Sequence, residues 1–518
     1  MFNMKRLDCC FLVCGNSKKT YQELSKTYSA IEPPTWALLL AESTRSVGFN
    51  INIIDANAEN LSEEEIYIRI KKLSPRLICF VAYGQNVNAG TVNMTGVIHI
   101  ASYLAKKNIN IPMSIIGSHV QALPIETLKK EKMIDFVFTN EAVYALRNTL
   151  KLDHFDSQNL SKIKGIAYRD GDKIKMTVSE KVVPTEKMDI DLPGYAWDLL
   201  PFDKKPLDLY RAPMWHAEYD FEKRTPYASL QTSLGCLFHC NFCMINILNR
   251  DDNDEIGVAS NYSTMRFWST EFIIKEFDKL ISMGVKTIRI VDEMFLLNPK
   301  YYVPLCKELE KRNKDDSLRI WSYSRIDTVK RPEILELVRK AGIKWLALGI
   351  ESGDKSIRLE VAKGKFEDVD VRKIIHQVHE ADIDVMANYM YGLPGDDHET
   401  IKKTYNLSVE LCTSGWNTYP TMALPGSLLY KEGVEKNIDL PKSYSGYSFH
   451  AYDTVCLPTE KLKPWEILKL RNEAFIDYHQ IPKFLERIKL RFGEKAVKNI
   501  IQMSQIKLER KIVVENTK

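Results

Sequence analysis

The sequence predicts an α/β fold: a doubly wound, Rossmann-like N-terminal sheet, a partial β/α barrel of six units, and a mostly helical C-terminal region. Strand-like apolar runs alternate with helical patterns through residue 150, and this rhythm resumes at Tyr227. Lysine-rich helical patterns dominate the end of the chain. We therefore expect four parts, which are the domains 1–150 and 227–430, a connector with a hairpin at 151–226, and the helical region 431–518.

Composition limits the classes of protein to consider. The 518 residues carry a net charge of +4, which is no footprint for nucleic-acid binding. No apolar run approaches the ~18 residues that a membrane-spanning helix needs. Ten cysteines in a chain rich in lysine and glutamate do not indicate a secreted disulfide scaffold. We expect a cytoplasmic protein without a membrane span.

The N-terminal sheet is expected to contain five strands joined by crossover helices. The strands are "CCFLVCG", "INIID", "LICFVAYG", "MSIIGSH" and "DFVFTN", with helices at 36–47, 63–73 and 92–107. Such sheets bind ligands at the carboxyl ends of their strands. The loops there carry the candidate binding residues Tyr83, Gly84, Gln85, Gly117 and His119.

The connector and the barrel follow in order. "GIAYRDGDKIKMT" predicts a hairpin that turns at Asp170-Gly171 or Gly171-Asp172. The barrel strands are expected at "YASLQTSLG", "TIRIVDE", "RIWSYSRID", "KWLALGIES", "DVMANYMYG" and "GWNTYPTMA". Helices are expected between them, at 270–282, 301–312, 332–341 and 369–381. In a β/α barrel the chemistry is found at the carboxyl ends of the strands.

Three cysteines, Cys236, Cys240 and Cys243, follow the first barrel strand in the spacing C-x3-C-x2-C. A [4Fe–4S] cluster has four irons, so three thiolates hold three of them and leave one iron open to bind a small molecule. A structural zinc site needs four ligands, and the chain has no second C-x-x-C pair. His239 is adjacent to Cys240 and is poorly placed to complete a tetrahedron. The spacing favours an open iron–sulfur cluster.

This stretch resembles the signature of the radical S-adenosylmethionine (SAM) superfamily, C-x3-C-x-aromatic-C, with Phe242 as the aromatic residue. "IRIVDEMF", "WSYSRID", "LGIESGD" and "YMYGLPGDD" resemble the motifs of the next four strands. The resemblance implies a [4Fe–4S] cluster whose open iron binds SAM, and reductive cleavage of SAM to a 5′-deoxyadenosyl radical. It also implies cofactor contacts from Phe242, Asp292, Glu293, Arg325, Glu351, Ser352 and Gly392. Leu234 and Leu237 depart from the commonest form, S-R-G-C-P-F, which leaves the packing and charge around the loop open.

Residues 1–150 resemble the cobalamin (B12)-binding domain that precedes some radical SAM barrels. The resemblance is carried by "EPPTWALLLAESTRSVGFNINIIDA", "YGQNVNAGT", "GSHVQALPIETL" and "DFVFTNEA". Periodicity alone equally suits a nucleotide or a flavin, but no G-x-G-x-x-G follows the first strand. The D-x-H-x-x-G motif that supplies a histidine to cobalt is also missing. We therefore expect cobalamin without that ligand. His119 is a candidate for the corrin or its nucleotide tail, and a plain loop histidine is the other interpretation.

Together the two halves imply a cobalamin-dependent radical SAM enzyme, and methylation of an unactivated carbon in a small molecule is the leading reaction. A radical cyclase or rearrangement enzyme is the alternative. An RNA methylthiotransferase is disfavoured, and so is an iron–sulfur electron carrier. The resemblance also implies an electron donor such as flavodoxin or ferredoxin. Tyr444, Tyr447, His450 and Tyr452 are candidates to line the barrel mouth, with aromatic packing as the other interpretation.

Overall fold

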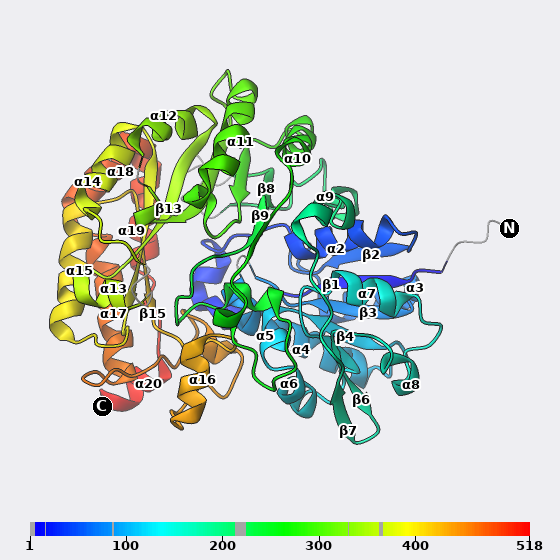
Figure 1. The fold of residues 1–518 in the computed structure, drawn as a ribbon. Helices are drawn as coiled ribbons and strands as arrows, with labels where there is room; N and C mark the ends of the chain where they lie inside the picture. The colour runs from blue at the N-terminus through cyan, green and yellow to red at the C-terminus, as the bar shows by residue number, and fades with distance from the viewer. Residues whose placement is uncertain are drawn as a thin grey trace.

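A computed structural model describes residues 6–15, 17–84, 87–212, 224–329, 331–361 and 366–517. Two sheets organise the chain, one in the N-terminal third and one in the second half (Figure 1). Searching the described residues for a helix long and apolar enough to cross a bilayer finds none. The expected fold class, two parallel sheets with a helical C-terminal region, is confirmed.

The first sheet has the strand order β2-β1-β3-β4-β5-β6-β7. Five strands are parallel, and their order reverses between β1 and β3, which is the point where sheets of this kind bind ligands. The predicted hairpin pairs antiparallel with β5 and extends this sheet. The strands are β1 (Cys9–Val13), β2 (Ile51–Asp55), β3 (Leu77–Val81), β4 (Met113–Ile116), β5 (Phe136–Phe138), β6 (Ile166–Asp170) and β7 (Lys173–Met176).

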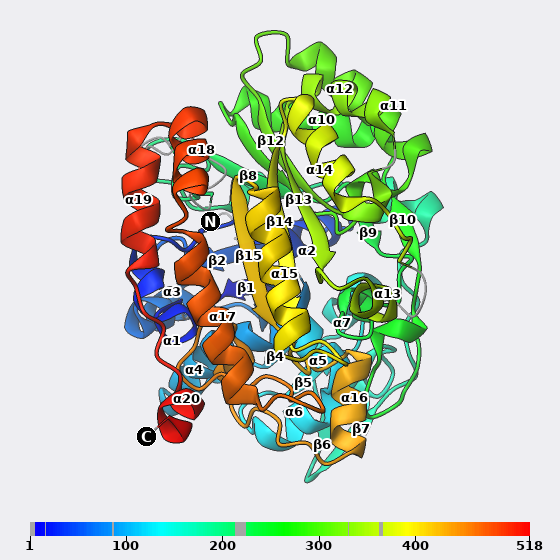
Figure 2. The ribbon, with the colours of Figure 1, turned by 90° about the vertical axis from the view of Figure 1, so that its left-hand side faces the viewer.

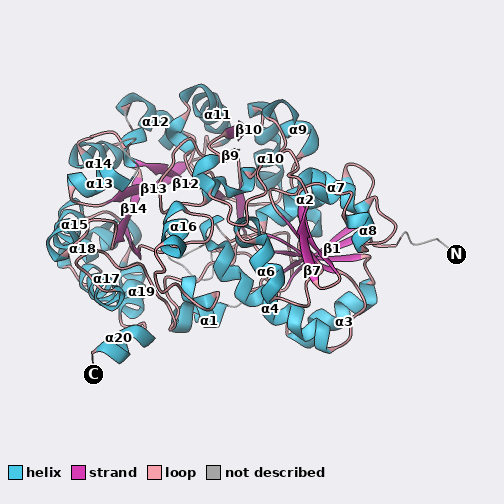
Figure 3. Ribbon diagram, turned by 60° about the horizontal axis from the view of Figure 1, so that its bottom comes forward, coloured by secondary structure: helices cyan, strands magenta, loops and turns pink. Residues whose placement is uncertain are grey.

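Helices cover both faces of the first sheet, as a doubly wound fold requires (Figure 3). Residues of α2 and α7 pack on one face in the main hydrophobic core, and residues of α3 and α4 pack on the other in a second core. A capping box at Ser62 and Glu65 starts α3 at the expected residue. These helices are α2 (Thr35–Arg45), α3 (Glu63–Leu73), α4 (Gly90–Lys106), α5 (Ser118–Ala122), α6 (Pro124–Lys130) and α7 (Val143–Leu150).

The second sheet is an open barrel of six parallel strands in the order β15-β14-β13-β12-β11-β8. Its strands are β8 (Tyr227–Leu230), β11 (Thr287–Ile290), β12 (Arg319–Arg325), β13 (Ile343–Glu351), β14 (Asp384–Tyr391) and β15 (Gly415–Pro420). Its helices are α10 (Thr270–Ser282), α11 (Pro299–Arg312), α12 (Pro332–Lys340), α13 (Lys355–Val361), α14 (Val371–Glu380) and α15 (His398–Leu411).

One strand expectation was wrong. "YASLQTSLG" is two strands, because the chain leaves the barrel after β8 and pairs as β9 (Ser233–Gly235) with β10 (Met265–Phe267). The physical cause is Asp292, whose carboxylate accepts hydrogen bonds from the backbone N–H of Thr232 (2.6 Å) and the hydroxyl of Ser233 (2.7 Å). These bonds turn the segment that leads into the cysteine loop.

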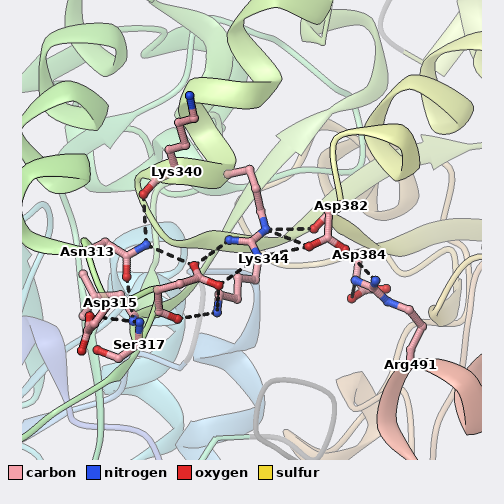
Figure 4. A network of polar contacts seen from close by, with 11 residues as sticks. Asn313, Asp315, Ser317, Lys340, Lys344, Asp382, Asp384 and Arg491 are labelled. Carbon is pink, nitrogen blue, oxygen red and sulfur yellow. Dashed lines mark hydrogen bonds and ion pairs between the residues drawn. The ribbon is translucent and has the colours of Figure 1, made fainter.

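The C-terminal helices cover the side and part of the base of the barrel. In Figure 2, α17 (Pro464–Tyr478) and α18 (Pro482–Phe492) run beside β15, followed by α19 (Glu494–Ser504) and α20 (Lys511–Asn516). At the amino ends of the strands, Phe492 stacks on Trp345 with ring centroids 5.5 Å apart. Arg491 donates to Asp382 (2.6 Å) and Asp384 (2.7 Å) in the network of Figure 4. These contacts cover part of the base, where a cavity of about 290 Å³ remains beside Trp345 and Phe492.

Candidate functional site

The cysteine loop starts at a backbone position that suits glycine. Gly235 has φ +88°, and a Cβ there would overlap the carbonyl oxygen of Thr264. Beyond it, Asn246 bridges the loop, because its Oδ1 accepts from the N–H of Cys236 (2.8 Å) and its Nδ2 donates to the Cys236 carbonyl (2.9 Å). The loop is thus held at both ends by residues of the same segment.

The three thiols lie close enough to interact electrostatically. Burial raises the pKa of Cys236 to about 12, that of Cys240 to about 11 and that of Cys243 well above its ordinary value, and the neighbouring thiols add to the shift of Cys243. Arg325 opposes the shifts of Cys236 and Cys240, and its Nη1 lies 4.0 Å from the sulfur of Cys240. Thiolates are the form that binds metal, so a nearby cation favours ligation.

Among the described residues, no group of three or more histidine, cysteine or acidic side chains is gathered as ligands of a single ion. A four-iron cluster places each thiolate on a different iron, so its ligands are spread farther apart than those of one metal ion. The donor set of three sulfurs on one loop fits a cluster of that kind. The other seven cysteines are buried free thiols.

Arg325 is positioned by three neighbours. Its guanidinium makes two hydrogen bonds of 2.6 Å to Asp327. It also stacks over Phe238, with Cζ 3.5 Å from the ring centroid, and over Phe366 at 4.4 Å. The predicted contact of Arg325 with SAM stays a prediction, but the structure brings this side chain to the loop.

The two acids after β11 differ in surroundings. Asp292 is buried with both oxygens occupied by Thr232 and Ser233, so it holds the start of the cysteine segment. Glu293 is partly accessible, and burial raises its pKa to about 7 although Arg289 lowers it. Of the two, Glu293 is the one with a side chain available to a ligand.

The β13 motif places Glu351 at the same barrel edge. Glu351 has φ +66°, which a non-glycine residue rarely adopts, and burial raises its pKa to about 7. The hydroxyl of Ser352 is buried and accepts from the N–H of Asp354 (3.1 Å), so it supports the turn. In this motif the side chain of Glu351 therefore stays partly accessible, whereas the side chain of Ser352 is engaged within the turn.

Phe242 and Gly392 come together through the β14 motif. Phe242 packs against Ile357, Met390 and Leu393. Gly392 has φ +81°, and its N–H donates to Asp396 (3.0 Å). The aromatic residue of the cysteine signature thus lies beside the "GLPG" turn, as expected if both face one adenine.

At the carboxyl edge of the first sheet, the hydroxyl of Tyr83 accepts a hydrogen bond from Gln121, and Gly117 has no room for a Cβ against Ala82. Gln85 lies outside the described residues. His119 is buried, its Nδ1 is 3.1 Å from the hydroxyl of Thr91, and burial lowers its pKa to about 3.

Residues of the C-terminal region pack near both edges. Tyr444 makes a T-shaped contact with His119 at 5.1 Å, which covers one side of that ring. Tyr447 is buried, and His450 stacks on Tyr21 with centroids 5.3 Å apart. Tyr452 is 47% exposed and lies on the surface. The role of these residues at the barrel mouth stays a prediction.

The carboxyl edges of the two sheets face each other across one cavity. The first sheet contributes Trp36, Tyr83 and Gly84, and the barrel contributes Gln231 and Glu293. The indole N–H of Trp36 and the amide oxygen of Gln231 are buried without a hydrogen-bond partner among the described residues. Buried polar atoms of this kind indicate a missing ligand or water. The cavity between them holds about 30 Å³.

A buried ion pair that we did not predict joins the two halves. Arg289 of β11 donates to both oxygens of Glu32 at 2.7 Å and to the hydroxyl of Tyr323 at 2.9 Å. Glu32 also accepts from the hydroxyl of Tyr227 (3.0 Å). The only sign of this ion pair in the sequence was an arginine inside a predicted barrel strand. That sign does not identify a partner 257 residues away.

Residues 230–408 match the family model described as the Radical SAM superfamily. This segment contains the cysteine loop and the strand ends described above. This part of the chain is similar to the radical SAM superfamily.

Curated relatives extend the likeness beyond that segment. An anaerobic magnesium-protoporphyrin IX monomethyl ester cyclase of Cereibacter sphaeroides is 23% identical over 76% of this chain, and the match covers 57% of the cyclase. An uncharacterized methyltransferase of Pyrococcus horikoshii is 24% identical over 90% of this chain and 92% of its own length. The chain thus spans little more than half of the cyclase but nearly all of the methyltransferase.

Two solved structures share the whole architecture. The radical SAM methyltransferase TsrM of Kitasatospora setae, with cobalamin and a [4Fe–4S] cluster bound, superposes with a TM-score of 0.66 at 13% identity, covering 97% of this chain and 99% of TsrM. The cobalamin-dependent enzyme OxsB, with aqua-cobalamin and SAM bound, superposes with a TM-score of 0.63 at 14% identity. This match covers 97% of this chain and 76% of OxsB. The chain therefore shares the fold of these two enzymes.

Proposed function

We propose that this protein is a cobalamin-dependent radical SAM enzyme that methylates an unactivated carbon of a small molecule. The observation that carries the proposal is the cavity between the two carboxyl edges, with the three-thiol loop beside it. The division into a cobalamin-binding domain (1–150), connector (151–226), barrel (227–430) and helical region (431–518) is part of the proposal.

We assign the cluster to Cys236, Cys240 and Cys243, and SAM to the barrel edge around Phe242, Glu293, Arg325, Glu351 and Gly392. Asp292 and Ser352 position the backbone beside it. Cobalamin is assigned to the edge with Tyr83, Gly84, Gly117 and His119, and to Gln85, which lies outside the described residues. When bound, the cluster and SAM supply a carbon-centred radical, and cobalamin supplies the methyl group.

The residues of this chain orient the reactants. Arg325 brings a positive charge to the thiolates, which a cluster site needs. Glu293 and Glu351 have pKa values raised to about 7 by burial, so each holds or releases a proton near neutral pH.

The likeness to the cyclase keeps ring closure as the second candidate reaction. Product mass separates the two, because methylation adds a methyl group and cyclisation does not. We further propose a flavodoxin or ferredoxin as electron donor. All ten cysteines are free thiols, which supports the cytoplasm as the compartment.

The test is anaerobic reconstitution with iron, sulfide, hydroxocobalamin and SAM. We expect cluster and corrin absorption and release of 5′-deoxyadenosine. Cys240→Ala should lose the cluster and SAM cleavage, whereas Cys306→Ala, in a buried helix position of α11, should keep both. SAM cleavage by Cys240→Ala would contradict the cluster assignment, and the absence of corrin absorption would contradict the N-terminal assignment.

A further inference from the structure

The barrel interior keeps a polar wall on its last two strands. The amide of Asn417 donates to Oδ1 of Asn388 (3.3 Å), and the hydroxyl of Tyr419 donates to the same atom (3.5 Å). Burial raises the pKa of Tyr419 to about 12, yet its side chain stays partly accessible. Side chains that are deep in the fold and still accessible line an internal space.

Arg471 of α17 reaches the open edge of this wall. Its Nε donates to the carbonyl of Thr418 (2.9 Å), and its Nη1 makes a long hydrogen bond to Asn472 (3.4 Å). In the strand register Thr418 pairs with Tyr389, and Tyr389 pairs with Glu351. Arg471 is therefore bonded to β15 at the same height along the strands as Glu351. Its charge acts on Tyr419 and on His450.

Among the described residues, Arg471 is a buried cation without a compensating anion. The residue is 4% exposed, and within the described parts of the chain it has no carboxylate partner and no hydrogen bond from Nη2. Burial lowers its pKa to about 10. Two buried arginines on the barrel strands contrast with it, since Arg289 is paired with Glu32 and Arg325 with Asp327.

A second guanidinium adds to the positive charge. Arg510 donates to the carbonyls of Phe449 (2.6 Å) and Ala451 (2.9 Å), which shapes the loop that carries His450. It too lacks a carboxylate among the described residues, and burial together with Arg471 lowers its pKa to about 9. Two buried positive charges near one another are unfavourable unless a ligand neutralises them.

Aromatic rings flank the same place. Tyr419 packs on Phe449 with centroids 4.9 Å apart, and Tyr21 stacks on His450. The acids assigned to SAM, Glu293 and Glu351, belong to other strands of the barrel. The interior therefore has a basic, aromatic side that the assigned cofactors do not use.

We propose that Arg471 binds an anionic group, a carboxylate or a phosphate, of the substrate in the barrel interior. The inference rests on the proposed function, because it assumes that the substrate enters the barrel. Nη2 provides a charge-assisted hydrogen bond, and the aromatic side chains flank the attached part of the molecule.

The test uses three small probes on the reconstituted enzyme: benzoate, phenyl phosphate and the neutral benzamide. Calorimetry should show at least one of the two anions binding about 10-fold or more tightly than benzamide, and Arg471→Gln should remove this preference. Arg471→Lys should keep part of it because the charge remains. Arg372→Gln, at an exposed helix position paired with Glu410, is the matched control and should bind as the wild type does.

Two results would overturn the inference: a wild-type enzyme that binds neither anion better than benzamide, or Arg471→Gln binding the anions as tightly as wild type. If Arg471→Gln proves unstable, the inference is tested by the preference of the wild type for the anions over benzamide and by the preference that Arg471→Lys retains. Cluster absorption and SAM cleavage are measured in the same samples. Their loss in the wild type would contradict the proposed function, whereas their retention without anion preference contradicts this inference alone.

Discussion

The buried pair between Glu32 and Arg289 predicts a large effect from a small substitution. Glu32→Gln keeps the shape of the side chain and removes its charge. Arg289 is 1% exposed and Glu32 6% exposed, so the guanidinium is left buried without an anion. Breaking a buried pair in this way costs about 3–5 kcal/mol. The exposed pair of Arg372 and Glu410, at 62% and 53% exposure, should contribute less than about 1 kcal/mol.

The assay is urea unfolding of Glu32→Gln, of the control Glu410→Gln, and of the double variant Glu32→Gln/Arg289→Gln. We expect a clearly lower midpoint for Glu32→Gln, a near wild-type midpoint for Glu410→Gln, and partial recovery in the double variant, which has no unpaired charge. Equal midpoints for Glu32→Gln and Glu410→Gln would refute the reasoning, and so would a double variant less stable than Glu32→Gln.

Three further predictions concern the site. Gly235→Ala should lower the iron bound per chain, whereas Gly284→Ala, also at positive φ but in open space, should cost about 1–2 kcal/mol and bind iron normally. Asp292→Asn should lower cluster occupancy, because an amide cannot accept every hydrogen bond that the carboxylate accepts; unchanged iron content would count against this role. Burial raises the folded-state pKa of Glu351 to about 7, so the folded protein keeps a proton that the unfolded chain has lost. Stability should therefore fall as pH rises from about 4.5 to about 7, and thermal scans across this range should show a shallower fall for Glu351→Gln.

Local patterns predicted most of the elements because their causes are local. The expected strand Ile51–Asp55 and the helices Glu63–Leu73 and Thr270–Ser282 match the structure residue for residue. A capping box starts the first of these helices, and the hydroxyl of Ser269 caps the second. Periodicity and end signals of this kind lie within a few residues of one another.

Contacts between segments that are distant in the sequence could not be predicted from such local patterns. Tyr444 covers His119 from 325 positions later in the chain, since 444 − 119 = 325. The break after β8 depends on Asp292, which is 60 residues from Thr232. Each of these changed the interpretation of a site residue: His119 is covered, and Asp292 positions the loop.

The arrangement of the two sheets explains why one chain carries both halves. Each parallel sheet gathers its ligand-binding residues at the carboxyl ends of its strands, whatever the other sheet does. In this chain those ends meet, since Tyr83 and Gly84 share a cavity with Gln231 and Glu293. The buried pair of Glu32 and Arg289 joins the halves close to that meeting point. In the proposed function each cofactor is held by its own sheet, so both can act on one substrate at this meeting point.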